Sequence, residues 1–176
     1  MKKDLAIHFT FAIALFVLIT LFRDWFSLGF VAFWIGGVLG TLLPDVDHLI
    51  YVYILKPNEA ASQKIASLIS QRRILTTWDT LASTSADRKG LLIHNAPFQI
   101  LFLIFSILIV TSGSLIGMGI ALGFMLHLIL DEVVDLVEIG NFDGWFSGFP
   151  VNLDSDQKRW FLVANVLILL ALGFFF

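Results

Sequence analysis

Long apolar runs separated by short polar connections dominate the chain. Five runs reach or approach the roughly 20 residues that a helix needs to cross a bilayer: about 5–22, 27–43, 93–111, 114–137 and 159–176. Pro44 ends or kinks the second run, but apolar residues resume and continue to about residue 55. The pattern therefore predicts five helices, the second bent at Pro44. Short connections at 23–26 and 111–113 predict two antiparallel hairpins.

The segment 56–90 has a different pattern. It is polar overall, but apolar side chains recur in it at nearly helical spacing: Ile65, Leu68, Ile69, Leu75 and Trp78. This spacing predicts an amphipathic helix, or two shorter helices, with one apolar face. That face either lies on the membrane surface or packs on the protein itself.

Composition indicates that the apolar runs are membrane spans. The 176 residues are 58% hydrophobic and 14% charged, and the mean hydropathy is +0.89. A soluble domain of this size could not hide so much apolar surface. We therefore expect an all-α fold, a polytopic membrane helical bundle of about five transmembrane helices. It would form a single membrane domain over 1–176, with a cytoplasmic amphipathic helical insert at about 56–90.

The distribution of basic residues predicts the orientation in the membrane. The first run resembles a secretory signal, but "RDWF" follows it instead of a small-residue cleavage site, which favours an uncleaved span. With five spans, Arg23 alone lies on one side. The other side carries ten basic residues: Lys2, Lys3, Lys56, Lys64, Arg72, Arg73, Arg88, Lys89, Lys158 and Arg159. Because Lys and Arg gather on the cytoplasmic side, we expect a multi-pass protein of the inner (cytoplasmic) membrane with a cytoplasmic N-terminus.

Imidazole and carboxylate groups gather at the cytoplasmic ends of the predicted helices. Ionisable residues in membrane segments are costly and usually mark function. His127, Asp131 and Asp135 are spaced i, i+4 and share one helix face, and Asp45 and His48 are spaced i, i+3. The whole candidate set is His8, Asp45, Asp47, His48, His94, His127, Asp131 and Asp135.

Such a set is typical of a metal site. Helical bundles build metal sites from carboxylates and imidazoles on facing helices. The chain has no cysteine, so its ligands would be nitrogen and oxygen, and we expect a divalent metal, with Zn or Mn first. Plainer explanations also exist, because His8 alone could be a polar interfacial residue. Glu132, on a different face from His127, is expected to be a solvated acid, and Trp145 and Phe146 are expected at the membrane interface.

Two pairs of glycines have the spacing of helix contacts. Gly36 and Gly40 lie four residues apart, as do Gly119 and Gly123. Small residues at this spacing let membrane helices approach closely, although glycine is also simply common in such helices. The pattern favours a close contact between the second and fourth helices.

Two motifs resemble a known family. "LPDVDH", "HLILD" and a histidine at the start of a membrane helix resemble the YdjM-type inner-membrane metal-dependent hydrolase family, over His8 to Asp131. That family typically has an early histidine, LPDxDH, an HRGxTH-like element and HLxxD. Here "LLIHNAPFQ" replaces HRGxTH, with one histidine and no arginine. The resemblance implies a set of metal ligands: Asp45, Asp47 or His48, His127 and Asp131, with His8 and His94 as further candidates.

These features predict a membrane-embedded metal-dependent hydrolase. The family is distantly similar to zinc-dependent phospholipases C, which implies a phosphodiester or lipid-phosphate substrate at the cytoplasmic face. Asp47 or Asp135 would act as general base, and His94 would orient the leaving group or complete the coordination. The alternatives are a non-catalytic metal-binding or metal-transport protein and a bundle whose polar residues only lock the helices together. No nucleic-acid signature appears, so the expected partners are membrane lipid and a small-molecule or lipid substrate.

Overall fold

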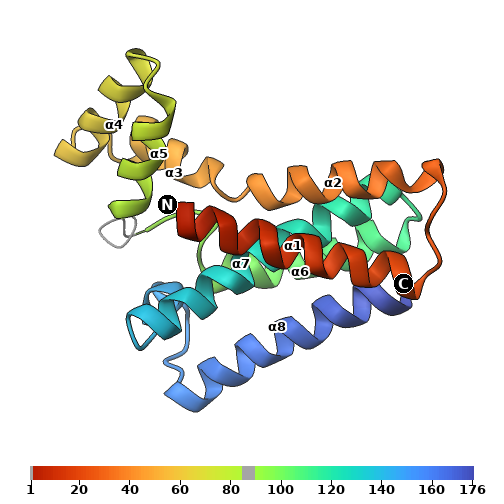
Figure 1. Ribbon diagram of the computed structural model, residues 1–176. Coiled ribbons are helices and arrows are strands. Elements are labelled where there is room, and N and C mark those ends of the chain that lie inside the picture. Colours follow the sequence, from red (N-terminus) through yellow and green to blue (C-terminus); the bar gives the residue numbers. More distant parts are fainter. Residues whose placement is uncertain (1, 85–89) are drawn as a thin grey trace.

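The computed structural model describes residues 2–84 and 90–176, and helices form most of them (Figure 1). The five apolar runs correspond to five helices: α1 (Lys2–Phe22), α2 (Val31–Leu42), α6 (Ala96–Thr111), α7 (Leu115–Glu138) and α8 (Ser155–Phe175). The described residues contain no strand, so the all-α prediction is confirmed. Some predicted features fall outside the described residues: Arg88, Lys89 and the side chains of Lys2, Lys3 and Trp78.

Two helical stretches of the described residues are long and apolar enough to cross a membrane. They are Leu28–Leu55 and Ser155–Phe175, while Ala6–Phe22 and Ala96–Thr111 are apolar but shorter. The first stretch is the bent helix predicted around Pro44. The count of five spans and the orientation stay predictions.

The helix bends at Pro44 and then continues. α3 (Val46–Ile50) follows α2, and a π-helical turn, η2 (Tyr51–Leu55), follows α3. Proline cannot donate a backbone hydrogen bond within a helix, which explains the interruption. The chain thereby carries the motif "LPDVDH" from the end of α2 into α3.

The polar insert forms two helices, α4 (Ala60–Ser70) and α5 (Ile74–Ser83). They pack against η2 through a small core of Val52, Ile65 and Leu81, so the insert packs on its own protein. Leu75 is 74% exposed and does not belong to this apolar face, contrary to the prediction from its spacing.

The glycine pairs bring α2 and α7 into backbone contact. A Cβ atom on Gly36 or Gly40 would overlap the carbonyl oxygen of Ile116 or Ile120, respectively, and one on Gly119 would overlap the carbonyl oxygen of Phe33. The expected close contact is confirmed, and it sets the end of α2 beside the middle of α7, from Ile120 to His127.

α7 lies in the middle of the bundle and contacts α1, α2, α6 and α8. This central position explains why Glu132 is fully buried, contrary to the expectation of a solvated acid. Trp145 and Phe146, in the short helix η4 (Asp143–Phe146), are also buried and so face the protein interior, while their depth relative to the membrane stays a prediction. They are buried because the loop after α7 folds back, and the Phe146 ring packs edge-on against Phe161 of α8.

Polar caps fix where two of the helices begin. The Asn95 side chain accepts a hydrogen bond from the backbone N–H of Phe98 and so caps α6, and Pro97 lies in the first turn. Such a cap satisfies a backbone donor that the helix leaves free. Ser114 caps α7 through the N–H of Gly117 in the same way. The first cap places His94 just before α6, where it faces α3 through Asp47 and His48.

Candidate metal centre

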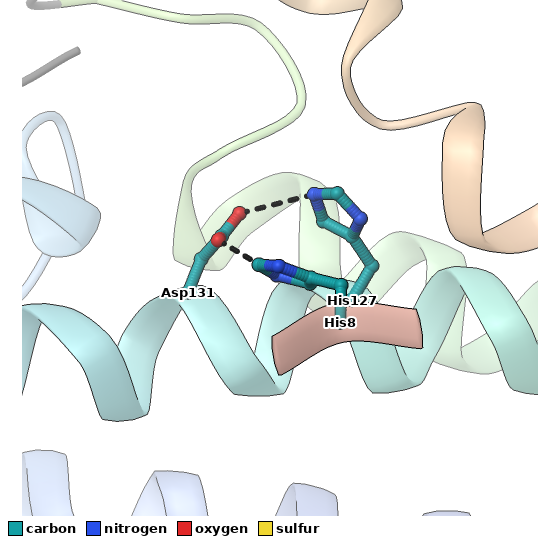
Figure 2. Close-up of side chains that lie close together, drawn as sticks. All are labelled: His8, His127 and Asp131. Carbon is teal, nitrogen blue, oxygen red and sulfur yellow. Dashed lines mark ion pairs between the residues drawn. The ribbon is translucent and has the colours of Figure 1, made fainter. Parts of the chain in front are cut away.

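Three histidines from three elements converge on one carboxylate, that of Asp131 in α7. The Nε2 atom of His8 in α1 lies 3.0 Å from Asp131 Oδ1, and Nε2 of His127 lies 3.3 Å from Oδ2. Figure 2 shows these two side chains pointing at the carboxylate. The Nε2 atom of His94, before α6, lies 3.2 Å from the same Oδ2. His8, His127 and Asp131 form a group that could hold a metal ion.

The centre is enclosed on its histidine side and more open on its carboxylate side. The side chains of His8, His94 and His127 are nearly buried, whereas Asp131 keeps 25% of its side-chain surface exposed. Asp45 is 20% exposed, and its Oδ1 lies 3.8 Å from Nε2 of His127. A small molecule would therefore approach the centre past the two carboxylates.

The outer nitrogen of His127 is held by a backbone carbonyl. Its Nδ1 lies 2.6 Å from the carbonyl oxygen of Thr41 in α2. A carbonyl oxygen can only accept, so Nδ1 carries the hydrogen and Nε2 presents its lone pair toward Asp131. Metal-binding histidines usually have their second nitrogen fixed in this way.

His94 has a carboxylate in the corresponding place. Its Nδ1 lies 3.1 Å from Oδ2 of Asp47, a fully buried side chain. The same carboxylate accepts the backbone N–H groups of Leu92, Ile93 and His94 at 3.1, 2.7 and 3.2 Å. Asp47 thus fixes both the segment that carries His94 and the orientation of its ring.

This arrangement leaves acceptor atoms facing one another. With the hydrogens on Nδ1, the Nε2 atoms of His94 and His127 are acceptors, and so are the oxygens of Asp131. Acceptors at such distances need a proton or a cation between them, because they otherwise repel one another.

In the metal-free protein, a proton on Nε2 of His94 can separate these acceptor atoms. His94 lies just before the first residue of α6. Burial lowers the pKa of this histidine, but hydrogen bonds and charge from Asp131 and Asp47 outweigh burial and raise the pKa to about 9. A metal at the centre would take the place of this proton, because a histidine ligand must be neutral at the binding nitrogen.

Two predicted candidates lie beside the centre. The ring of His48 stacks on that of His94, with centroids 5.0 Å apart. Asp135 accepts a hydrogen bond from Trp145 Nε1 at 2.8 Å, and the Trp145 ring lies 5.8 Å from the His94 ring. Both residues therefore support the surroundings of His94, and sequence reasoning had not connected Trp145 or Thr41 with the centre.

Over the described residues 2–84 and 90–176, the chain is thus a helical protein with two helices that could cross a membrane and a largely buried His/Asp group that could hold a metal ion. No protein-family model, no curated protein and no solved structure matches it. Its function is therefore inferred from its own residues and their geometry.

Proposed function

We propose that the chain is a membrane-embedded metal-dependent hydrolase. His8, His94, His127 and Asp131 would hold one divalent metal, Zn or Mn, at the cytoplasmic face of the inner membrane. The basic residues counted along the chain support this orientation, and the YdjM-type resemblance supports the class of activity.

The observation that carries this proposal is the pair of acceptor nitrogens aimed at Asp131. Thr41 and Asp47 orient His127 and His94 so that both Nε2 lone pairs point inward. Partners of this kind, behind the ligands, fix the ring and raise its basicity. A polar network that only joined helices would be satisfied by donors facing acceptors with neutral histidines, whereas this one needs an added proton or a cation at the common point.

The residues of the centre would have different roles in hydrolysis. A bound divalent metal would supply Lewis acidity and lower the pKa of an attacking water. Asp45 is partly exposed and lies beside His127, so it is placed to accept the proton of that water as general base. Asp47 and Asp135, the bases expected from sequence, already accept hydrogen bonds from the His94 segment and Trp145. We therefore assign them to positioning.

The substrate we propose is a phosphodiester or lipid phosphate of the membrane. The open carboxylate side of the centre lies where α2 ends, so a headgroup at the bilayer surface could reach it. Histidines and a divalent metal together would bind an anionic group.

A non-catalytic metal-binding or metal-transport protein is the second candidate. One observation favours it, because four ligands saturate a tetrahedral Zn, and a saturated site is structural. A metal of higher coordination number, such as Mn, would keep positions for water and substrate with the same ligands.

Metal analysis followed by activity assays tests the proposal. Detergent-purified wild-type protein should hold about one equivalent of Zn or Mn, the stoichiometry of one four-ligand centre, and Asp131→Asn should lose it. The matched control is Asp143→Asn, an exposed carboxylate that pairs with Lys158. A wild-type protein without metal above background contradicts the site. Bound metal without hydrolysis across a panel of phosphodiesters and lipid phosphates favours the second candidate.

A further inference from the structure

An apolar crevice opens between α1 and α2, next to the metal centre. Its empty space is about 250 Å³ when the part open to the outside of the protein is included. Its lining includes Phe9, Ala12, Ile13, Trp34, Val38 and Thr41. It therefore lies on the helix pair that also carries His8 and Thr41.

Small residues shape the inner wall of the crevice. Ala12 lines it from α1 and Gly37 from α2, and the ring of Phe16 occupies the space that a Cβ atom on Gly37 would need. Phe16 is almost fully buried and stacks on Phe33, so it forms a fixed apolar floor. A thin apolar chain would fit between the two helices above this floor.

The walls offer apolar surface to the membrane side. Ile13 and Val38 on the rim are 55% and 48% exposed. The hydroxyl of Thr41 donates to the carbonyl oxygen of Gly37 at 2.9 Å, so it does not require a polar partner in the crevice. An aliphatic group would therefore lose no hydrogen bond on entering.

One end of the crevice is shared with the metal centre. Phe9 follows His8 directly, and the His8 ring lies 4.2 Å from the His127 ring. Thr41 lines the crevice with its side chain and holds Nδ1 of His127 with its carbonyl oxygen. With its chain in the crevice, an amphiphilic molecule would have its polar head at the end of α2, from where it could reach Asp131 on the more open side of the centre.

We propose that this crevice binds one hydrocarbon chain of the lipid substrate while its phosphate group lies at the metal centre. This inference rests on the proposed function and deepens it by specifying the substrate as a lipid phosphate or lipid phosphodiester. An apolar crevice beside a metal-binding head site fits an amphiphile whose chain enters the crevice and whose phosphate oxygens meet the metal.

The probes are two alkyl phosphates with the same head, dodecyl phosphate and butyl phosphate. Ala12→Phe fills the crevice, and Ala14→Phe is the matched control because Ala14 lies on an exposed part of the same helix. In the metal-loaded protein, Ala12→Phe should reduce the ratio of dodecyl to butyl phosphate affinity about tenfold. That is the loss expected when about two methylene groups no longer enter the crevice. Ala14→Phe should leave the ratio at the wild-type value.

Two further measurements guard against misfolding of the filled variant. Val38→Phe narrows the crevice from its exposed rim and should lower the same ratio. Dodecyl phosphate brominated on its chain should also quench Trp34 fluorescence saturably, and that part of the quenching should vanish in Trp34→Phe.

The outcomes separate this inference from the proposed function. Loss of chain discrimination in Ala12→Phe and Val38→Phe, with metal content retained, supports the crevice. An unchanged ratio in both variants, with metal and butyl phosphate still bound, overturns the crevice alone. A second copy of the chain is the other occupant. The wild-type protein would then be a dimer that Ala12→Phe and Val38→Phe convert to monomers. If they do so while the ratio of dodecyl to butyl phosphate affinity stays unchanged, this face is a subunit contact and the proposal is wrong. Absence of metal from every form refutes the proposed function itself.

Discussion

The Nδ1 atom of His94 and the Oδ2 atom of Asp47 lie 3.1 Å apart, and that same oxygen also accepts the backbone N–H groups of Ile93 and His94. One buried carboxylate therefore fixes the path of the segment before α6 and the direction of a ring it carries. The acidic motif after Pro44 is coupled to the metal centre through this contact.

Asp47→Asn should weaken metal binding without removing any of the four proposed ligands. An amide has only one acceptor oxygen, so it cannot hold both the backbone N–H groups and Nδ1 of His94 as the carboxylate does. Loss of such an orienting partner typically costs about 10–100-fold in metal affinity. Competition with a chelator of known affinity measures the change. An affinity equal to that of the wild type would show that Asp47 only anchors the backbone.

The four histidines should divide into two classes. His8→Ala, His94→Ala and His127→Ala each remove an Nε2 atom that lies within 3.3 Å of Asp131, so each should lower metal affinity strongly. His48→Ala removes only a ring stacked on His94 and should retain most of the metal. Elemental analysis of the four purified variants checks this division. If His48→Ala were the variant that lost its metal while the other three retained it, the ligands would instead lie near His48 in α3.

The metal-free protein should lose stability as pH rises from neutral. The pKa of His94 is raised from 6.5 to about 9 in the fold, so the protonated form stabilises the folded state. This contribution is complete below pH 6.5 and disappears as pH passes about 9. Thermal unfolding of chelator-treated protein between pH 6 and 10 measures it, and His94→Gln provides the comparison. Identical pH profiles for both proteins would mean that His94 is not protonated between the two carboxylates.

Gly36→Ala should destabilise the bundle much more than Gly144→Ala. The added methyl group at Gly36 meets the backbone of Ile116, which cannot rotate away, whereas no atom lies within 4 Å of a Cβ on Gly144. Overpacking of this kind costs about 1–3 kcal/mol. Unfolding in mixed detergent micelles compares the two variants. Equal stabilities would show that α2 and α7 can separate without cost.

Reporter fusions should place the insert and the C-terminus on opposite sides of the membrane. We expect a fusion within 56–90 or after Arg159 to report the cytoplasm and one after Phe176 to report the outside. The opposite pattern would move the metal centre to the outer face and change the lipids available to it.

The helices follow from the sequence because long apolar runs have few alternatives to helix in a membrane. The bend at Pro44 follows from the sequence because proline interrupts the hydrogen bonds of a helix. The contact of α2 with α7 follows because glycines four residues apart let two helices approach closely. The gathering of His8, His94 and His127 at one end also follows, because the order of the helices places them there.

The finer chemistry does not follow from the sequence. The Thr41 carbonyl has no residue-specific signature, since every residue carries that group. Burial of Glu132 depends on which helices surround α7, and helical spacing alone does not determine that. The contact of Asp135 with Trp145 depends on how the loop after α7 folds back, which residue patterns do not specify.

The crossing of α2 and α7 has a consequence for which positions can vary. Ile116 and Ile120 meet the glycines with their carbonyl oxygens, and the side chain of Ile116 is 43% exposed. Many apolar residues could replace either isoleucine without moving the Thr41 carbonyl relative to His127. The geometry of the centre thus depends on the lack of a side chain at Gly36 and Gly40. It depends much less on which bulky side chains stand at positions 116 and 120.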